Sequence, residues 1–263
     1  MQLARGAVDG QVRYGDVVGD RFHELYGDVF DQCARTGATW ALGEVELLAP
    51  CVPRRILFVM GGFLPDGVAA LPPGSVPWML PKAVPNVSGP GGVVIPPAGV
   101  DAFWIEAEIA IVIGRPIHHA TETQAREAIF GYTCFNDITA PEFMFEDVAE
   151  RRWAPNLDIL RAKCQDTFAS MGPWISTDLT EDDLRHGLAI RGRVNGELKG
   201  EGNTRRQKFA PADWVRSASA IVSLHPGDVL TLGTPQPCDA IRGDTFEIEV
   251  EKIGTLAGRI APQ

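Results

Sequence analysis

The sequence predicts an α+β chain that is mainly β, with few helices and a small β-rich unit at its N-terminus. Three observations predict this class. Apolar and polar residues alternate over several short segments, as they do in half-buried strands. Between residues 51 and 97, prolines and glycines are too dense for a long helix. Helix-starting signals are few, so we expect strands to outnumber helices.

The first 30 residues alternate and turn, and Gly19-Asp20 between two short runs predicts a hairpin. The region rich in proline and glycine that follows then marks a linker into a loop-rich domain. A boundary falls between residues 55 and 75. We therefore divide the chain into a small β-rich N-terminal domain, residues 1–65, and a core, residues 66–263.

The core elements follow in order. A strand covers residues 103–113. Thr121, with Gln124 three residues later, predicts a helix that runs to residue 130 and ends at Gly131. A second helix is expected to open at Pro141 and run through Phe145. The remaining predicted elements are a strand at 132–136, a helix at 211–221, a turn and strand at 227–232, and a strand at 244–250.

Composition excludes several classes of protein. No apolar run reaches the roughly 18 residues of a membrane helix, and the N-terminus lacks the apolar core of a signal peptide, so we expect a cytoplasmic protein without a membrane partner. The net charge of −10 argues against nucleic-acid binding but permits an anionic substrate that meets a local cation. The five cysteines are widely spaced and are expected to be buried, reduced thiols.

The strand at 103–113 carries the most informative feature, a Glu-x-Glu pair in apolar surroundings. Alternation places Glu106 and Glu108 on the same face, roughly 7 Å apart. Two carboxylates held so close on a half-buried surface need a cation, or one must hold a proton. A hard divalent ion, Mg²⁺ or Mn²⁺ with Ca²⁺ as an alternative, is the simplest compensation. The alternative is a solvated pair of surface charges.

A series of short motifs follows this strand in a fixed order. It contains Gly131 to Asp137, Arg161 to Phe168, Met171 to Trp174, Val194 to Glu197, Gly202 to Thr204, Pro226 to Asp228, Gly233 to Pro235 and Ile253 to Leu256. This series resembles the fumarylacetoacetate hydrolase family over about residues 82–260. The resemblance implies a mixed β-roll or sandwich core with few helices, in a homodimer. Apolar surface for pairing is expected around residues 78–80, although these residues could equally belong to the core.

The resemblance also implies a site. Glu106, Glu108 and Asp137 match the family's ligands for a divalent cation, usually Mg²⁺ or Mn²⁺. Lys163 matches the family lysine beside the metal, which helps to hold the substrate's oxyanion. Thr234 matches a residue whose hydroxyl, with neighbouring backbone amides such as that of Gly233, receives the substrate carboxylate. Lys82 and Ser88 match a loop that borders the pocket. Taken alone, each of these residues could be a turn residue or a surface charge.

The sequence departs from the family's hydrolytic members at two places. Their G-R-N-Y-x-x-H-x-x-E segment, whose His and Glu activate water, corresponds here to residues 59–67, which contain neither residue. The family's T-A-R-D has become Thr139-Ala140-Pro141-Glu142, so an arginine often near the substrate is missing. The losses remove a general base but leave a cation and a lysine that can stabilise an enolate.

We therefore expect a metal-dependent enzyme acting on a small 2-oxo or 1,3-dicarbonyl carboxylate, such as an acylpyruvate, through a metal-stabilised enolate. Its reaction is hydrolysis of a carbon–carbon bond, as in a hydrolase. The alternative is an isomerase, tautomerase, decarboxylase or cyclase that uses the same site without activating water. A non-catalytic metal-binding member of the family is the second alternative.

Overall fold

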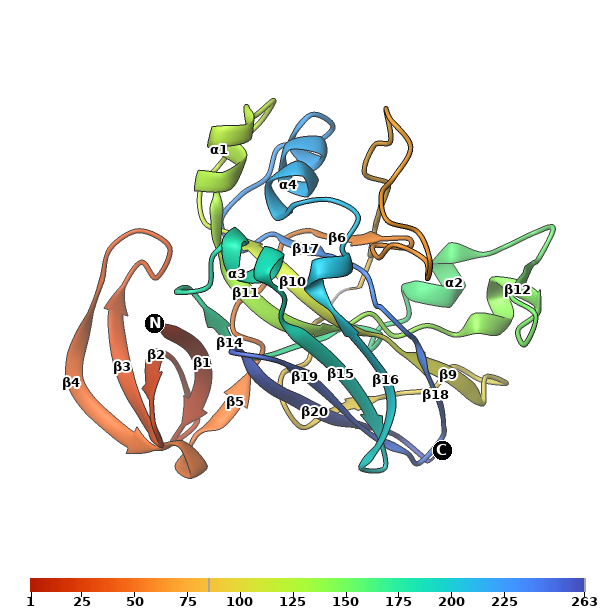
Figure 1. Cartoon of the computed structure of the whole chain (residues 1–263). Coiled ribbons are helices and arrows are strands. Elements are labelled where there is room, and N and C mark those ends of the chain that lie inside the picture. The colour runs from red at the N-terminus through yellow and green to blue at the C-terminus, as the bar shows by residue number, and fades with distance from the viewer. Residues whose placement is uncertain (85, 263) are drawn as a thin grey trace.

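The computed structural model describes residues 1–84 and 86–262 and is built mainly from strands (Figure 1). The strands of the N-terminal part are β1 (Gln2–Val8), β2 (Gln11–Val18), β3 (Arg21–Gly27), β4 (Cys33–Ala41) and β5 (Glu46–Leu48). Those that follow are β6 (Ile56–Val59), β7 (Met79–Pro81), β8 (Gly92–Val94), β9 (Ala102–Ile105), β10 (Ala107–Ile113), β11 (Ile129–Asn136), β12 (Phe145–Asp147), β13 (Arg152–Trp153), β14 (Ser170–Ser176), β15 (Ala189–Val194), β16 (Glu197–Asn203), β17 (Val229–Thr231), β18 (Cys238–Ile241), β19 (Thr245–Val250) and β20 (Gly254–Ile260). The helices are α1 (Glu122–Glu127), α2 (Ile159–Lys163), α3 (Glu181–His186) and α4 (Pro211–Ser219), with short 3-10 turns at Leu42–Glu44, Pro141–Phe143 and Thr204–Arg206. The predicted class, mainly β with few helices, is confirmed.

The N-terminal strands form an antiparallel meander, drawn in red and orange in Figure 1. Val18 faces Arg21 across the turn, which confirms the hairpin predicted at Gly19-Asp20. The meander joins the core because β1 pairs with β14, and one sheet of 11 strands runs through both regions. In that sheet β6, on the N-terminal side of the predicted boundary at residues 65 and 66, pairs with β17 and β7 of the core.

The core consists of this large sheet packed against a five-stranded sheet in the order β16-β15-β19-β20-β8. Strand β10 belongs to the large sheet, where it lies between β11 and β17; it packs against β15 and β19 of the second sheet, and all of its residues are buried. Ile109 and Ile111 are fully buried, with 0% of their surface exposed, in the main apolar cluster of the molecule. A strand buried on both faces gives its polar side chains no access to bulk water.

Local signals located some helices and not others. Thr121 and Gln124 form the predicted capping box, although α1 ends at Glu127 and residues 129 and 130 already belong to β11. Pro211 opens α4 as predicted. The helix expected from Pro141 to Phe145 is wrong: Pro141–Phe143 is one 3-10 turn, and Phe145 begins β12. The short helices α2 and α3 were not predicted.

The cysteines are all free. Cys51, Cys134 and Cys238 are buried, and burial raises the pKa of the Cys51 thiol to about 12. Cys33 and Cys164 are only partly buried, which corrects the expectation for those two. Within the described residues, none of the helices is long and apolar enough to cross a membrane.

Candidate metal centre

Strand register brings the three predicted acidic ligands together. Glu106 lies between β9 and β10, and β10 pairs with β11 so that Ala107 faces Asn136. Asp137 follows β11 directly, and its amide donates to the Glu106 carbonyl over 3.3 Å. The Asn136 side chain accepts from the Glu106 amide at 3.1 Å, which fixes the chain at this crossing.

The three carboxylates are close and buried. One oxygen from each of Glu106, Glu108 and Asp137 lies within 4.8 Å of the other two. Their exposed fractions are 7%, 0% and 0%. The predicted strand at 103–113 is broken at Glu106, between β9 and β10, so the two glutamates do not lie on one face of a single strand. The break still brings both carboxylates to one buried site, which excludes the alternative of a solvated surface pair. Three acidic oxygens at this separation form the donor set that a hard divalent cation prefers.

Two buried lysines offset part of this charge. Lys163, at the end of α2, places Nζ at 2.7 Å from Glu106 Oε2 and at 2.6 Å from Asp137 Oδ2. Lys82 places its Nζ at 2.6 Å from Asp137 Oδ1 and donates to the Lys163 carbonyl at 2.5 Å. Three carboxylates therefore meet two ammonium groups, and one negative charge is left without a cation.

That remaining charge belongs to Glu108. Its Oε2 accepts from the Gly233 amide at 2.9 Å, but its buried Oε1 has no hydrogen-bond partner among the described residues. Burial, with Asp137 and Glu106 nearby, raises the pKa of Glu108 well above its usual value. A buried carboxylate oxygen without a partner is costly. The donor set therefore fits a divalent cation held by Glu106, Glu108 and Asp137.

The other groups shift in directions that follow from the same contacts. Burial raises the pKa of Glu106, although Lys163 opposes the shift. Burial would also raise the pKa of Asp137, but Lys163 and Lys82 outweigh it, so this carboxyl stays ionised. Burial lowers the pKa of Lys82. For Lys163 the surrounding carboxylates outweigh burial and raise the pKa, so its ammonium keeps its charge.

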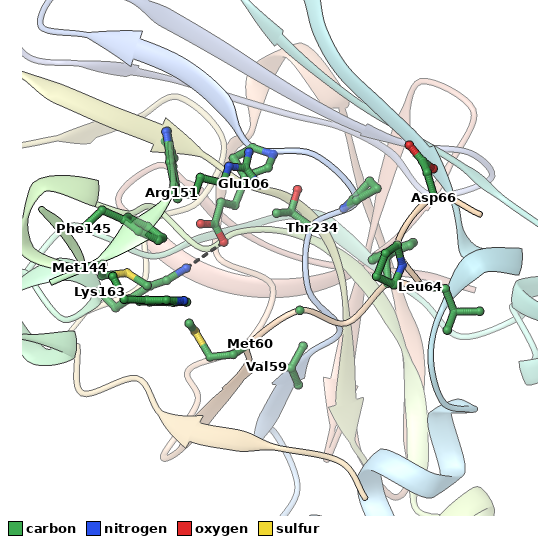
Figure 2. Close-up of a pocket in the computed structure, with 17 residues that line it drawn as sticks. Val59, Met60, Leu64, Asp66, Glu106, Met144, Phe145, Arg151, Lys163 and Thr234 are labelled. Carbon is green, nitrogen blue, oxygen red and sulfur yellow. Dashed lines mark hydrogen bonds and ion pairs between the residues drawn. The ribbon is translucent and has the colours of Figure 1, made fainter. Parts of the chain in front are cut away.

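A cavity of about 420 Å³ opens beside this cluster (Figure 2). Glu106 and Lys163 line the floor of this cavity. A dashed line in Figure 2 marks the ion pair between them. Residues 59–66 and 234–237 supply two walls. Trp104, Met144, Phe145, Arg151 and Trp153 supply a third. The cluster can therefore be reached by a small molecule.

The close approach of two walls requires glycine. Gly233 has a φ of 83°, a left-handed conformation, and a Cβ there would lie 2.7 Å from the Gly62 amide nitrogen. A Cβ on Gly62 would lie 1.9 Å from the Leu232 carbonyl oxygen. These glycines let Thr234 line the cavity while the Gly233 amide bonds to Glu108.

The remaining predicted site residues differ in their placement. Thr234 lines the cavity, and its hydroxyl donates to the Gln236 carbonyl at 3.2 Å. The Gly233 amide contacts Glu108 rather than the open cavity. Lys82 and Ser88 do not line the cavity: Lys82 is buried behind Asp137, and the Ser88 hydroxyl donates to the Ala169 carbonyl. Lys82 therefore positions a carboxylate instead of bordering the pocket.

Sequence reasoning missed the aromatic wall and Arg151. Trp104 and Phe145 pack with ring centroids 5.3 Å apart, and Phe145 and Trp153 with centroids 4.6 Å apart. The available signal is the group of aromatic residues Phe143, Phe145 and Trp153, of which the sequence prediction assigned the first two to a helix. None of the five histidines is among the residues that line the cavity, in agreement with the missing dyad.

Comparisons with known proteins agree with this geometry. Residues 69–261 match the family model described as fumarylacetoacetate (FAA) hydrolase C-terminal, and residues 1–50 match the model described as Rv2993c-like, N-terminal. Protein Rv2993c of Mycobacterium tuberculosis is 33% identical over 262 residues, which cover 98% of this chain and 94% of that protein.

Two solved structures match along their whole length. A protein from Mycobacterium abscessus has a TM-score of 0.87 and 32% identity, with 100% of both chains covered. A 5-carboxymethyl-2-hydroxymuconate delta-isomerase from Mycobacterium smegmatis has a TM-score of 0.84 and 32% identity, with 99% of both chains covered.

Proposed function

This chain belongs to the fumarylacetoacetate hydrolase family, and from that premise we propose a divalent-metal-dependent enzyme that converts a small 2-oxo or 1,3-dicarbonyl carboxylate through its enolate. One observation carries the proposal: a buried trio of carboxylates, one of them without a cation, adjoins a cavity that is lined by one member of the trio, Glu106. The family match and the cluster of carboxylates both support an enzyme of this family with an acidic metal site.

Glu106, Glu108 and Asp137 would hold Mg²⁺ or Mn²⁺, with Ca²⁺ as an alternative. When bound, the cation supplies positive charge that stabilises an enolate oxygen and orients two substrate oxygens. Lys163 presents a second, fixed positive charge at the cavity floor. The Thr234 hydroxyl lines the opposite wall and can turn from the Gln236 carbonyl to donate to a carboxylate or carbonyl oxygen of the substrate.

The residues that line the cavity favour enolate reactions that need no activated water, such as tautomerisation, isomerisation or decarboxylation. Water activation needs a general base near the reacting carbon. The wall formed by residues 59–66 supplies only apolar groups and Asp66, and no histidine lines the cavity. The similarity to a delta-isomerase supports the same choice.

Hydrolysis of a carbon–carbon bond is the second candidate, and Asp66 is the observation in its favour. Its carboxylate lines the cavity from the segment where hydrolytic relatives carry their dyad, and is 3.9 Å from the Arg206 guanidinium. In that reaction the oxygen of water bonds to the acetyl carbonyl carbon, and the bond from that carbon to the neighbouring methylene carbon breaks. Its electron pair leaves as the pyruvate enolate, which takes up a proton, so that acetylpyruvate and water give acetate and pyruvate.

Assays with acetylpyruvate and oxaloacetate distinguish carbon–carbon bond hydrolysis from reactions that stop at the enolate. Protein stripped with a chelator and reloaded with Mg²⁺ or Mn²⁺ is mixed with each compound. Ultraviolet absorbance follows the enol, and proton NMR identifies products. Enolate chemistry predicts faster keto–enol exchange, or pyruvate and carbon dioxide from oxaloacetate, without acetate from acetylpyruvate. Acetate and pyruvate from acetylpyruvate would establish the hydrolase instead.

The metal alone, without protein, sets the background rate in this experiment. Glu108→Gln is the matched variant, because it keeps the side-chain volume and removes the charge. We expect it to lose most of the acceleration. If the wild-type protein accelerates no reaction of either compound above the metal alone, the enzyme proposal fails in favour of a non-catalytic metal-binding protein.

A further inference from the structure

Arg151 lies at the edge of the catalytic cavity on a small hairpin. The hairpin pairs β12 with β13, and Arg151 precedes β13 with a φ of 49°. This left-handed turn conformation directs the chain back toward the cavity wall. Figure 2 shows Arg151 on the same side of the cavity as Glu106 and Phe145, across from Asp66 and Leu64.

The Arg151 guanidinium has no ion-pair partner among the described residues, whereas its neighbour does. Arg152 is paired with Glu146 and lies 3.7 Å from Asp147 Oδ2. Two acids of the hairpin, Glu146 and Asp147, are therefore engaged by Arg152 and not by Arg151. Lys163, the other cation of the cavity lining, is matched by Glu106 and Asp137. Arg151 is thus the cation of this lining whose charge is free for a ligand.

An aromatic platform orients this free cation. The Arg151 guanidinium carbon lies 5.3 Å from the centroid of the Trp104 ring. Trp104 is itself held, because its indole nitrogen donates to Asp239 Oδ1 at 2.9 Å and its ring packs near Phe145. Stacking on an aromatic ring leaves the in-plane N–H donors of a guanidinium open, and that fork matches a carboxylate.

We propose that Arg151 binds a second carboxylate of the substrate, remote from the end held at the acidic trio, and so selects dianionic over monoanionic substrates. This inference rests on the proposed function.

Two acylpyruvates of nearly equal size test the assignment. Succinylpyruvate ends in a carboxylate where butanoylpyruvate ends in a methyl group. Initial rates with the Mg²⁺-loaded protein give kcat and KM for both, whichever enolate reaction is observed. We expect the wild type to favour succinylpyruvate. Arg151→Met should raise KM for succinylpyruvate about tenfold, the cost of one charge-assisted contact, and leave butanoylpyruvate unchanged.

Arg152→Met is the matched control, because it removes an arginine from the same hairpin without touching the cavity lining. It should change neither substrate. Arg151→Lys should recover part of the preference. Added salt should weaken the preference in the wild type but not in Arg151→Met, because Arg151 is exposed.

The outcomes separate this inference from the function on which it rests. If the wild type converts both acylpyruvates with the same KM, or if Arg151→Met affects both alike, Arg151 is not the carboxylate receptor and the enzyme proposal stands. If the wild type converts neither acylpyruvate, the assignment of Arg151 fails, and the assay with acetylpyruvate and oxaloacetate decides the enzyme proposal separately. Equal melting temperatures for the wild type and the Arg151 and Arg152 variants exclude unfolding as the cause of any difference.

Discussion

At the metal centre, the three carboxylates differ in what neutralises them. Asp137 faces two lysines and Glu106 faces one, but Glu108 has only a backbone amide. The charge left over therefore belongs to the Glu108 carboxylate, whose Oε1 is buried without a hydrogen-bond partner among the described residues. Without a cation that group is most stable when protonated, and with a cation it must be ionised.

This competition between proton and metal predicts a dependence on pH. Because the pKa of Glu108 is raised, its contribution to stability without metal is fully present below its usual value of 4.5 and is lost as pH rises through the higher folded value. Metal binds the ionised form. The rise in melting temperature caused by Mn²⁺ should therefore be small near about pH 5 and grow toward about pH 8.

Differential scanning fluorimetry of chelator-stripped protein, with and without Mn²⁺, measures this effect across that range. Glu108→Gln should melt at a higher temperature than the stripped wild type at neutral pH and lose most of the response to Mn²⁺. A metal-induced shift of constant size across the pH range would contradict the proposed role of Glu108.

Lys82 gives a second prediction at this scale. Replacing it by methionine leaves the buried Asp137 with one ammonium group in place of two, and removes the hydrogen bond to the Lys163 carbonyl. Breaking a buried ion pair costs about 3–5 kcal/mol. We expect Lys82→Met to lose about 3 kcal/mol of unfolding free energy without metal, and clearly less with saturating Mn²⁺, which supplies the missing charge.

Urea unfolding with and without Mn²⁺ checks this expectation. Lys199→Met, which removes an exposed lysine paired with Glu197, is the control and should have no measurable effect. If Lys82→Met were equally destabilising in both conditions, Lys82 would serve packing and not charge compensation.

The sequence could reveal a site residue only where the pattern that identifies it lies in neighbouring residues or in a family motif. The alternation predicted for one strand placed Glu106 and Glu108 together, and the family resemblance added Asp137 and Lys163. Burial of Lys82 depends on the approach of the loop at residues 82–84 to α2, and a free Arg151 depends on which acids its neighbours engage. Both are long-range properties that no residue pattern encodes.

The same distinction holds for secondary elements. Elements with signals inside four or five residues, such as the Thr121 capping box and the Gly19-Asp20 hairpin, form as expected. The segment after Pro141 does not become a helix, because Phe145 and Trp153 pair across a hairpin and the Phe145 ring packs against the rings of both Trp104 and Trp153. Tertiary contacts outweighed the local helix signal there.

Contact between two wall elements of the cavity leads to a prediction. Gly62→Ala would bring a Cβ to 1.9 Å from the Leu232 carbonyl oxygen, so the segment at residues 59–63 must move away from the loop at residues 232–235. We expect a loss of about 2 kcal/mol in unfolding free energy and a fall of kcat/KM, because Thr234 and the Glu108 contact lie in that loop.

Gly43→Ala is the control for this variant, since no atom lies within 4 Å of a Cβ built there. Thermal unfolding and steady-state rates are measured for both. Wild-type stability and wild-type rates for Gly62→Ala would show that the two walls are not held in fixed contact.

For the molecule as a whole, the homodimer remains a prediction with a direct test. Val76 and Trp78, beside β7, are 76% and 59% exposed, which leaves apolar surface for a second copy. We expect sedimentation equilibrium to give twice the chain mass of 28.5 kDa. Trp78→Glu should shift the protein toward the monomer, whereas a monomeric wild type would reject the prediction.

The continuity of the large sheet decides what the N-terminal strands contribute. Strand β1 pairs with β14 through Gln2 with Ser176 and Leu3 with Ile175, and Leu3 and Ile175 are fully buried in one apolar cluster. Deleting residues 1–50 would expose that cluster and leave β14 as an open edge. An apolar open edge is a template for pairing with another chain. The metal ligands, by contrast, come from β9 to β11 and the residue after it.

We therefore expect the chain from residue 51 onward to melt at a temperature at least about 5 °C lower, as loss of several buried contacts implies, and to self-associate at micromolar concentration. Its folded fraction should still bind Mn²⁺, because no ligand is removed. Fluorimetry, light scattering and titration with Mn²⁺ measure the three effects. A truncated chain that stays monodisperse and melts like the full one would mean that the N-terminal domain folds apart from the core, and that pairing between β1 and β14 adds nothing to the stability of the sheet.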